Sequence, residues 1–159
     1  MNGGLVPLFL LSATLALMLS FAPIRMTSLG LLAFAAITPL LFLMSGALSS
    51  TIIFLGLWAS MIATALVVYL PIARWSAAIL PLCLNAGFWM GAYAALYSDR
   101  AGLALGLVPA LLAFPVKWLI RRKFDIVIKV VASWMIAIAS LSMFVSLMPT
   151  PGYKLDHME

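Results

Sequence analysis

The few charged residues of this chain are concentrated in short gaps between long apolar runs. Nine basic and four acidic residues make up 8% of the 159 positions, whereas 66% of the positions are hydrophobic. A soluble domain carries about 25% charged residues, and a chain this apolar has too little polar surface to face water. The sequence therefore indicates a protein whose surrounding solvent is lipid.

The apolar runs are long enough to cross a bilayer as helices. A transmembrane helix needs about 20 residues, and charges and helix breakers divide the chain into six such spans. Transmembrane β-strands would alternate polar and apolar residues, and these spans do not. We predict an all-α, polytopic membrane bundle in one transmembrane domain, residues 1–148, with a short polar tail at 149–159. The six spans are expected at about 4–22, 27–48, 51–70, 76–98, 101–120 and 126–148.

Lysine and arginine residues are divided unevenly between the two sides of this bundle. Six alternating spans place only Arg100 and Lys154 on the side of the termini. Basic residues are retained preferentially on the cytoplasmic side, so we expect a bacterial-type inner (plasma) membrane protein with both termini outside. The other side, expected to be cytoplasmic, receives Arg25, Arg74, Lys117, Arg121, Arg122, Lys123 and Lys129.

The densest basic group surrounds the end of the fifth span. It comprises Lys117, Arg121, Arg122, Lys123 and Lys129. Such a group fixes topology and attracts anionic lipids, by about 1 kcal/mol for each basic residue near the surface. Docking of an acidic partner subunit is the alternative. The positive charge flanks spans and forms no aromatic-interleaved patch, so we expect no nucleic acid partner.

One further pairing is expected beside this group. Asp125 precedes Lys129 by one helical turn. A carboxylate four residues before an ammonium is the favourable order on a helix, so the two side chains are predicted to pair.

The two halves of the chain resemble each other weakly at a shift of about 75 residues. The segment WASMIA at 58–63 is similar to ASWMIA at 132–137, and LGL occurs at both 29–31 and 105–107. With three spans in each half, a true duplication would insert the second half upside down. The result would be a 3+3 inverted repeat of the kind found in many transporters. Chance similarity between apolar helices is the alternative.

No carboxylate or histidine lies in the middle of a predicted span. Asp99 and Asp125 fall at span ends, and Asp156, His157 and Glu159 fall in the tail. This placement argues against a Ser–His–Asp hydrolase, a metal site and a carrier driven by a buried carboxylate. We therefore expect no enzyme, no cofactor and no metal, while an enzyme acting on lipids at the interface stays open.

The most polar side chain in mid-span is Asn85. An amide in hydrocarbon must find a hydrogen-bond partner, so Asn85 either joins two helices or lines a substrate path. Pro81 and Trp89 share its helix face, at four-residue spacing, and Pro81 leaves the backbone carbonyl one turn earlier without its helical donor. These three residues are the candidates for a substrate path.

Two pairs of glycines have the spacing of close helix contacts. Gly87 and Gly91 lie in the fourth span, and Gly102 and Gly106 lie in the fifth. Small residues four apart let two helix backbones approach closely. We interpret both motifs as packing within the bundle, with a seam between protomers of a homo-oligomer as the alternative.

These observations favour two classes of function. Prolines within the spans, which bend or break helices, occur at Pro39, Pro81, Pro109 and Pro115. These broken helices, the half-to-half similarity and Asn85 favour a transporter- or channel-like protein for a neutral or weakly polar solute. The small size, short loops and scarcity of polar groups within the spans favour a non-catalytic accessory or assembly subunit of a larger membrane complex.

Overall fold

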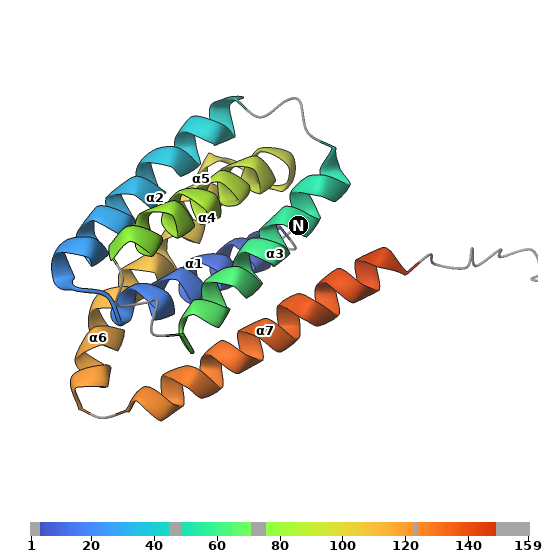
Figure 1. The fold of residues 1–159 in the computed structure, drawn as a ribbon. Helices are drawn as coiled ribbons and strands as arrows, with labels where there is room; N and C mark the ends of the chain where they lie inside the picture. Colours follow the sequence, from blue (N-terminus) through green and yellow to red (C-terminus); the bar gives the residue numbers. More distant parts are fainter. Residues whose placement is uncertain (1–3, 45–48, 71–75, 123, 149–159) are drawn as a thin grey trace, which may run out of the picture.

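A computed structural model describes residues 4–44, 49–70, 76–122 and 124–148, with the side chains of all of these except residues 44, 76, 77 and 125. Every regular element in this part of the chain is a helix, and the helices pack side by side into a bundle (Figure 1). The expected tail, Arg74, Lys123 and the side chain of Asp125, the expected partner of Lys129, lie outside the described part.

The helices follow one another with short connections. In chain order they are α1 (Leu5–Ser20), α2 (Ile24–Met44), α3 (Ser50–Val67), α4 (Ser76–Tyr97), α5 (Arg100–Leu107), the 3₁₀ segment η2 (Val108–Leu112), α6 (Ala113–Arg121) and α7 (Asp125–Leu147).

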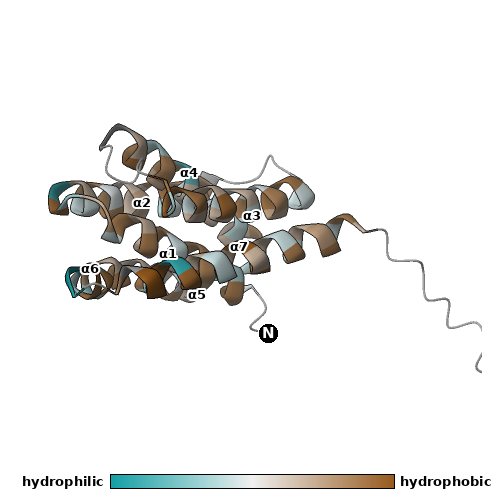
Figure 2. Cartoon of the chain, turned by 60° about the horizontal axis from the view of Figure 1, so that its bottom comes forward, coloured by the Kyte–Doolittle hydropathy of each residue, from teal (hydrophilic) through white to brown (hydrophobic). Residues whose placement is uncertain are grey.

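Five stretches of helix are long and apolar enough to cross a membrane, and hydrophobic residues dominate every helix (Figure 2). The stretches are Ile24–Leu43, Ser50–Val67, Ala78–Tyr97, Arg100–Arg121 and Ile126–Leu147. With 16 residues, α1 is shorter. At a rise of 1.5 Å per residue it is about 24 Å long, against a hydrocarbon thickness of about 30 Å. The structure thus confirms an all-helical bundle with helices of membrane-spanning length.

The short helix α1 occupies the centre of the bundle. It contacts all the other described helices, and 11 of its 16 residues are buried. Its hydroxyl groups are satisfied within the helix itself, because Ser12 donates to the Leu8 carbonyl at 2.9 Å and Thr14 donates to the Leu10 carbonyl at 2.7 Å. Helices rather than lipid therefore cover most of α1.

The other helices are arranged around α1 in three groups (Figure 1). Helix α2 packs extensively on α4, and the run α5–η2–α6 packs along α1. Helix α3 contacts α1, α4 and α7, whereas α7 touches mainly α3 and lies at the edge of the bundle. Of the 18 consecutive residues that form the most apolar part of α7, only 11% are buried inside the bundle.

The fifth span, expected at 101–120 with two prolines that bend or break it, is one helical stretch whose middle is not α-helical. Residues Val108–Leu112 adopt a 3₁₀ turn between α5 and α6. Pro109 lies at the start of this turn and Pro115 lies in the first turn of α6. Because proline has no N–H to donate along a helix, a tighter turn of 3₁₀ type replaces the α-helical pattern here.

Helix α2 begins at Ile24, three residues before the expected start at Thr27. The backbone N–H of Thr27 donates to the Pro23 carbonyl at 2.9 Å. Proline is well suited to the position just before or at the first turn of a helix, so the chain turns directly from α1 into α2.

The described basic residues lie mostly at one end of the bundle. At this basic end α1 and α3 end, α2 begins, α6 ends and α7 begins. The Tyr69 hydroxyl just after α3 donates to the Lys129 carbonyl of α7 at 2.5 Å. Arg100 begins α5 at the opposite end, directly after α4.

Candidate functional site

The asparagine at mid-span joins α4 to α3. The Asn85 amide nitrogen (Nδ2) donates to the Ser60 hydroxyl oxygen (Oγ) at 2.8 Å. The Trp89 indole nitrogen (Nε1), one turn along α4, donates to the Asn85 amide oxygen (Oδ1) at 3.2 Å. We call these three side chains the amide cluster.

A row of small residues on α3 receives the amide cluster. A Cβ atom at Gly56 would enter the ring of Trp89, and Thr64 donates its hydroxyl to the Ser60 carbonyl at 2.7 Å. Gly56, Ser60 and Thr64 recur every four residues, which places them on one helix face. Sequence reasoning did not single out this row, although its four-residue spacing is visible in the sequence.

Half of the hydrogen-bonding capacity of Asn85 remains unused in the described part of the chain. An amide side chain has two N–H donors and two acceptor lone pairs, and one of each is engaged. The side chain is exposed at the surface of the bundle, as is Pro81 one turn before it on α4. The amide cluster can therefore offer one donor and one acceptor to a weakly polar group.

The two glycine pairs lie in two different helix contacts. A Cβ atom at Gly87 or Gly91 would collide with α2, at Ile37 and at the Thr38 carbonyl. A Cβ atom at Gly106 would lie 3.0 Å from the Leu8 side chain of α1, whereas a Cβ atom at Gly102 would collide first with Ser98 and Asp99, just before α5. The α4 pair thus serves the contact with α2. In the α5 pair, Gly106 serves the contact with α1 and Gly102 mainly the turn before α5.

Two apolar grooves flank the interrupted fifth span. The α1–η2 groove, about 640 Å³, is lined by Phe9, Leu10, Ala13, Val108, Pro109, Leu111, Leu112 and Pro115. The α2–η2 groove, about 380 Å³, is lined by Leu31, Leu32, Phe34, Ala35, Ala104, Leu107, Val108, Ala110 and Leu111. Val108 and Leu111 belong to both grooves, so η2 separates two spaces of ligand size.

Lys117 ties α6 to the corner between α1 and α2. Its ammonium group donates to the Ala22 carbonyl, which follows the end of α1. It also donates to the Thr27 hydroxyl oxygen at 2.8 Å, and that hydroxyl in turn donates to the Leu19 carbonyl at 3.0 Å. A cation beside the last carbonyls of a helix is stabilised by the helix dipole.

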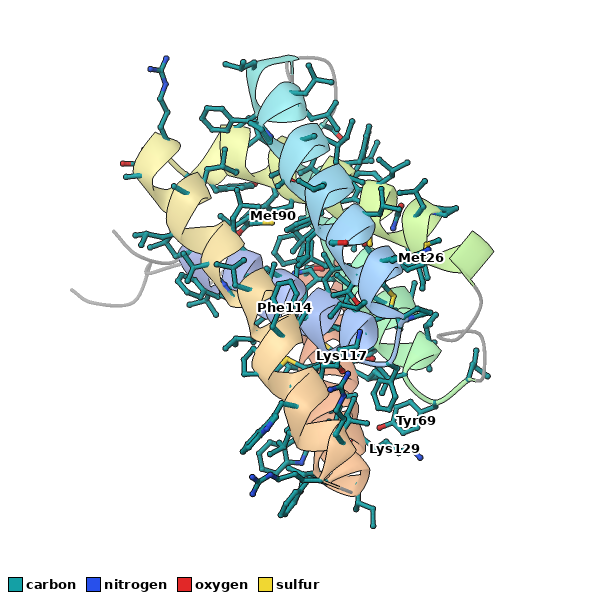
Figure 3. All side chains as sticks on the ribbon, turned by 90° about the vertical axis from the view of Figure 1, so that its left-hand side faces the viewer. Met26, Tyr69, Met90, Phe114, Lys117 and Lys129 are labelled. Atoms are coloured by element: carbon teal, nitrogen blue, oxygen red, sulfur yellow. The ribbon has the colours of Figure 1, made fainter. Side chains whose placement is uncertain are left out.

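The remaining described residues of the basic group lie near Lys117 in the chain but do not share these contacts. The Arg122 guanidinium lies over the Trp118 ring, 4.2 Å from its centroid, as in a cation–π contact. Arg121 is exposed. Figure 3 shows Lys117 and Lys129 toward the same end of the bundle.

The predicted site residues thus occupy separate places. The amide cluster belongs to α3 and α4, the grooves border η2, and Lys117 connects α6 with α1 and α2. Within the residues that the structure describes, no three His, Cys, Asp or Glu side chains gather as metal ligands. The buried thiol of Cys83 lies in α4.

Comparisons with protein-family models, curated proteins and solved structures give no match for this chain.

Proposed function

We propose that the protein is a small multi-pass transporter for a neutral or weakly polar solute. The observation that carries the proposal is the 3₁₀ stretch η2, halfway along the fifth span, with the α1–η2 groove beside it. A 3₁₀ stretch in the middle of a helix often marks a functional hinge. In many transporters, helices that are interrupted near the midplane form the binding site.

The packing of the helices supports a 3+3 inverted repeat. In such a repeat α1, α2 and α3 correspond to α4, the fifth span (α5–η2–α6) and α7, respectively. The contact of α2 with α4 then corresponds to the contact of the fifth span with α1. Both contacts are extensive, but the glycine pairs lie on α4 and on the fifth span, which are not counterparts in this exchange. The contact of α3 with α7 corresponds to itself, because each of these two helices is the counterpart of the other.

The second half departs from this symmetry at α7. Helix α3 packs on both α1 and α4, whereas α7 contacts α1 only slightly and packs on α3. The outward position of α7 therefore accounts for the difference between the halves. The contact of α2 with α4 matches that of the fifth span with α1 in extent, which supports a position of η2 near the interface of the two halves.

The lining of the α1–η2 groove favours an uncharged solute. All of its lining side chains are apolar, and none carries a charge or a hydroxyl. An ion would lose its hydration there without gaining a partner. The amide cluster offers a polar contact on another face of the bundle, and its role in the solute path stays a prediction.

Thiol accessibility tests this proposal. In a Cys83→Ala background, single cysteines at Ala13 and Leu112 would lie in the α1–η2 groove, and a control cysteine at Ala137 would lie on the exposed surface of α7. Because maleimides react with thiolates in water, a membrane-impermeant maleimide should label the groove positions and spare Ala137→Cys. Absence of labelling at both groove positions from either side of the membrane would contradict a transport path.

The exposed surface of α7 favours the second candidate, an accessory subunit of a larger complex. Large apolar side chains recur at helical spacing on this surface and include Val127, Val130, Trp134, Leu141 and Val145. A partner helix could pack along this row. Purification in mild detergent tests the candidate, because a partner-free monomer or small homo-oligomer would exclude it.

A further inference from the structure

The α2–η2 groove has apolar walls, and basic residues lie beyond it on the same helices. Phe34 and Ala110 form a buried floor, and Leu32 and Leu111 are exposed at the rims. The two walls belong to α2 and to the run from α5 to α6. These walls have no extensive contact with each other, so the groove opens to the bilayer.

Toward the basic end, polar residues continue both walls at helical spacing. On α2, Ser28 and then Arg25 follow Leu32, and both are exposed. On the opposite wall, Phe114, Lys117 and Arg121 follow Leu111 at steps of three or four residues. Figure 3 shows Phe114 and Lys117 in succession toward the end of the bundle where Lys129 lies.

We propose that one anionic phospholipid of the surrounding bilayer occupies the α2–η2 groove. One acyl chain lies between α2 and η2, and the phosphate lies between Arg25 and Arg121. Lys117 has three N–H donors, of which two bond to Ala22 and Thr27. The third is left for the phosphate. A phospholipid fits this arrangement because its acyl chain matches the apolar groove and its phosphate matches the basic residues beyond it.

The charge at the mouth of the groove selects among occupants. Arg25 belongs to α2 and Arg121 to α6, so each of the two walls is continued by one arginine. A neutral solute would leave this charge unused, and a second copy of the chain would bring the same positive charge to the mouth. The proposal is independent of transport, which we assign to the α1–η2 groove.

Photo-cross-linking tests the proposal on the full-length protein in lipid nanodiscs. Phosphatidylglycerol with a diazirine on one acyl chain should cross-link to residues 31–35 and 104–111. Unlabelled phosphatidylglycerol should compete, and phosphatidylcholine should not. Equal competition by the two lipids, or cross-links spread evenly over all outward-facing helices, would overturn the proposal in favour of ordinary boundary lipid.

Matched variants make the test specific. Ala35 lines the groove, whereas its exposed neighbour Ala36 does not. Ala35→Trp should abolish cross-linking to 104–111, and Ala36→Trp should preserve it. Arg25→Gln and Arg121→Gln should each weaken phosphatidylglycerol competition about fivefold, while Arg100→Gln at the other end should leave it unchanged. Thermal unfolding in phosphatidylcholine reports whether each variant is folded, and a folded Ala35→Trp with unchanged cross-links would contradict the proposal.

Discussion

At the scale of single residues, the polar side chains of the membrane region are satisfied mainly by near neighbours. Most serine and threonine hydroxyls donate to carbonyls of their own helices, as Thr38 does to Phe34 at 2.6 Å. Thr27 of α2, which donates to the Leu19 carbonyl of α1, is an exception. Asn85 also bonds to another helix, through the side chain of Ser60. That contact connects two helices in a setting where lipid offers no alternative partner.

Replacing Asn85 with leucine should destabilise the protein. The variant loses the bonds to Ser60 and Trp89, and interhelical hydrogen bonds in membranes contribute about 0.6–1.7 kcal/mol each. We expect a loss of about 1 kcal/mol in reversible unfolding in detergent. In a double-mutant cycle with Ser60→Ala, the two losses should be less than additive. Strict additivity would show that the bond contributes nothing.

At the scale of elements, proline determines where the fifth span departs from a regular helix. Pro109 begins the 3₁₀ turn, whereas Pro115 occupies the third position of α6, where a missing N–H costs little. The two prolines therefore differ in consequence, although the sequence presents both simply as prolines within one span.

Replacing Pro109 with alanine should allow one continuous helix from α5 to α6. An interior proline costs up to about 3 kcal/mol, and we expect part of this, about 1 kcal/mol, to return as stability. Thiol labelling at Ala13→Cys should fall because the α1–η2 groove narrows. The matched Pro115→Ala should leave the stability unchanged. Unchanged stability and labelling in Pro109→Ala would mean that packing, not proline, maintains the break.

How far the sequence could predict these elements depends on the range of the interactions. Apolar runs bounded by Arg25, Arg100 and Arg121 reveal helices, because each helix satisfies its own backbone. The central position of α1 and the facing of Ser60 toward Asn85 depend on contacts between residues distant in the chain, which hydropathy does not record. The 3₁₀ turn could be predicted only in part, because prolines indicate that the α-helix is disturbed but do not indicate which conformation replaces it.

At the scale of the whole molecule, the distribution of charge defines two unlike ends. Lys117, Arg121, Arg122 and Lys129 lie at the basic end, and Arg100 lies at the other. We propose that the basic end faces the cytoplasm and that both termini lie outside, because basic residues resist translocation.

Neutralising the densest basic group should disturb this orientation. Replacing Arg121, Arg122 and Lys123 with glutamine removes three of the basic residues expected on the cytoplasmic side. A C-terminal reporter that is active only outside the cytoplasm should lose activity as part of the population inverts. Arg100→Gln should preserve the activity, because it strengthens the same bias. An unaltered reporter in the triple variant would refute the orientation.

The enclosure of α1 has a consequence for the order in which the protein assembles. During synthesis α1 leaves the ribosome before α3 and the α5–α6 span, the helices that finally cover it. The hydroxyls of α1 bond to carbonyls of the same helix, so α1 can be surrounded by lipid without leaving a hydroxyl unsatisfied. Its lipid neighbours are then exchanged for protein only as the later spans arrive. Helix α1 is thus made before the helices that cover it and is among the last to reach its final surroundings.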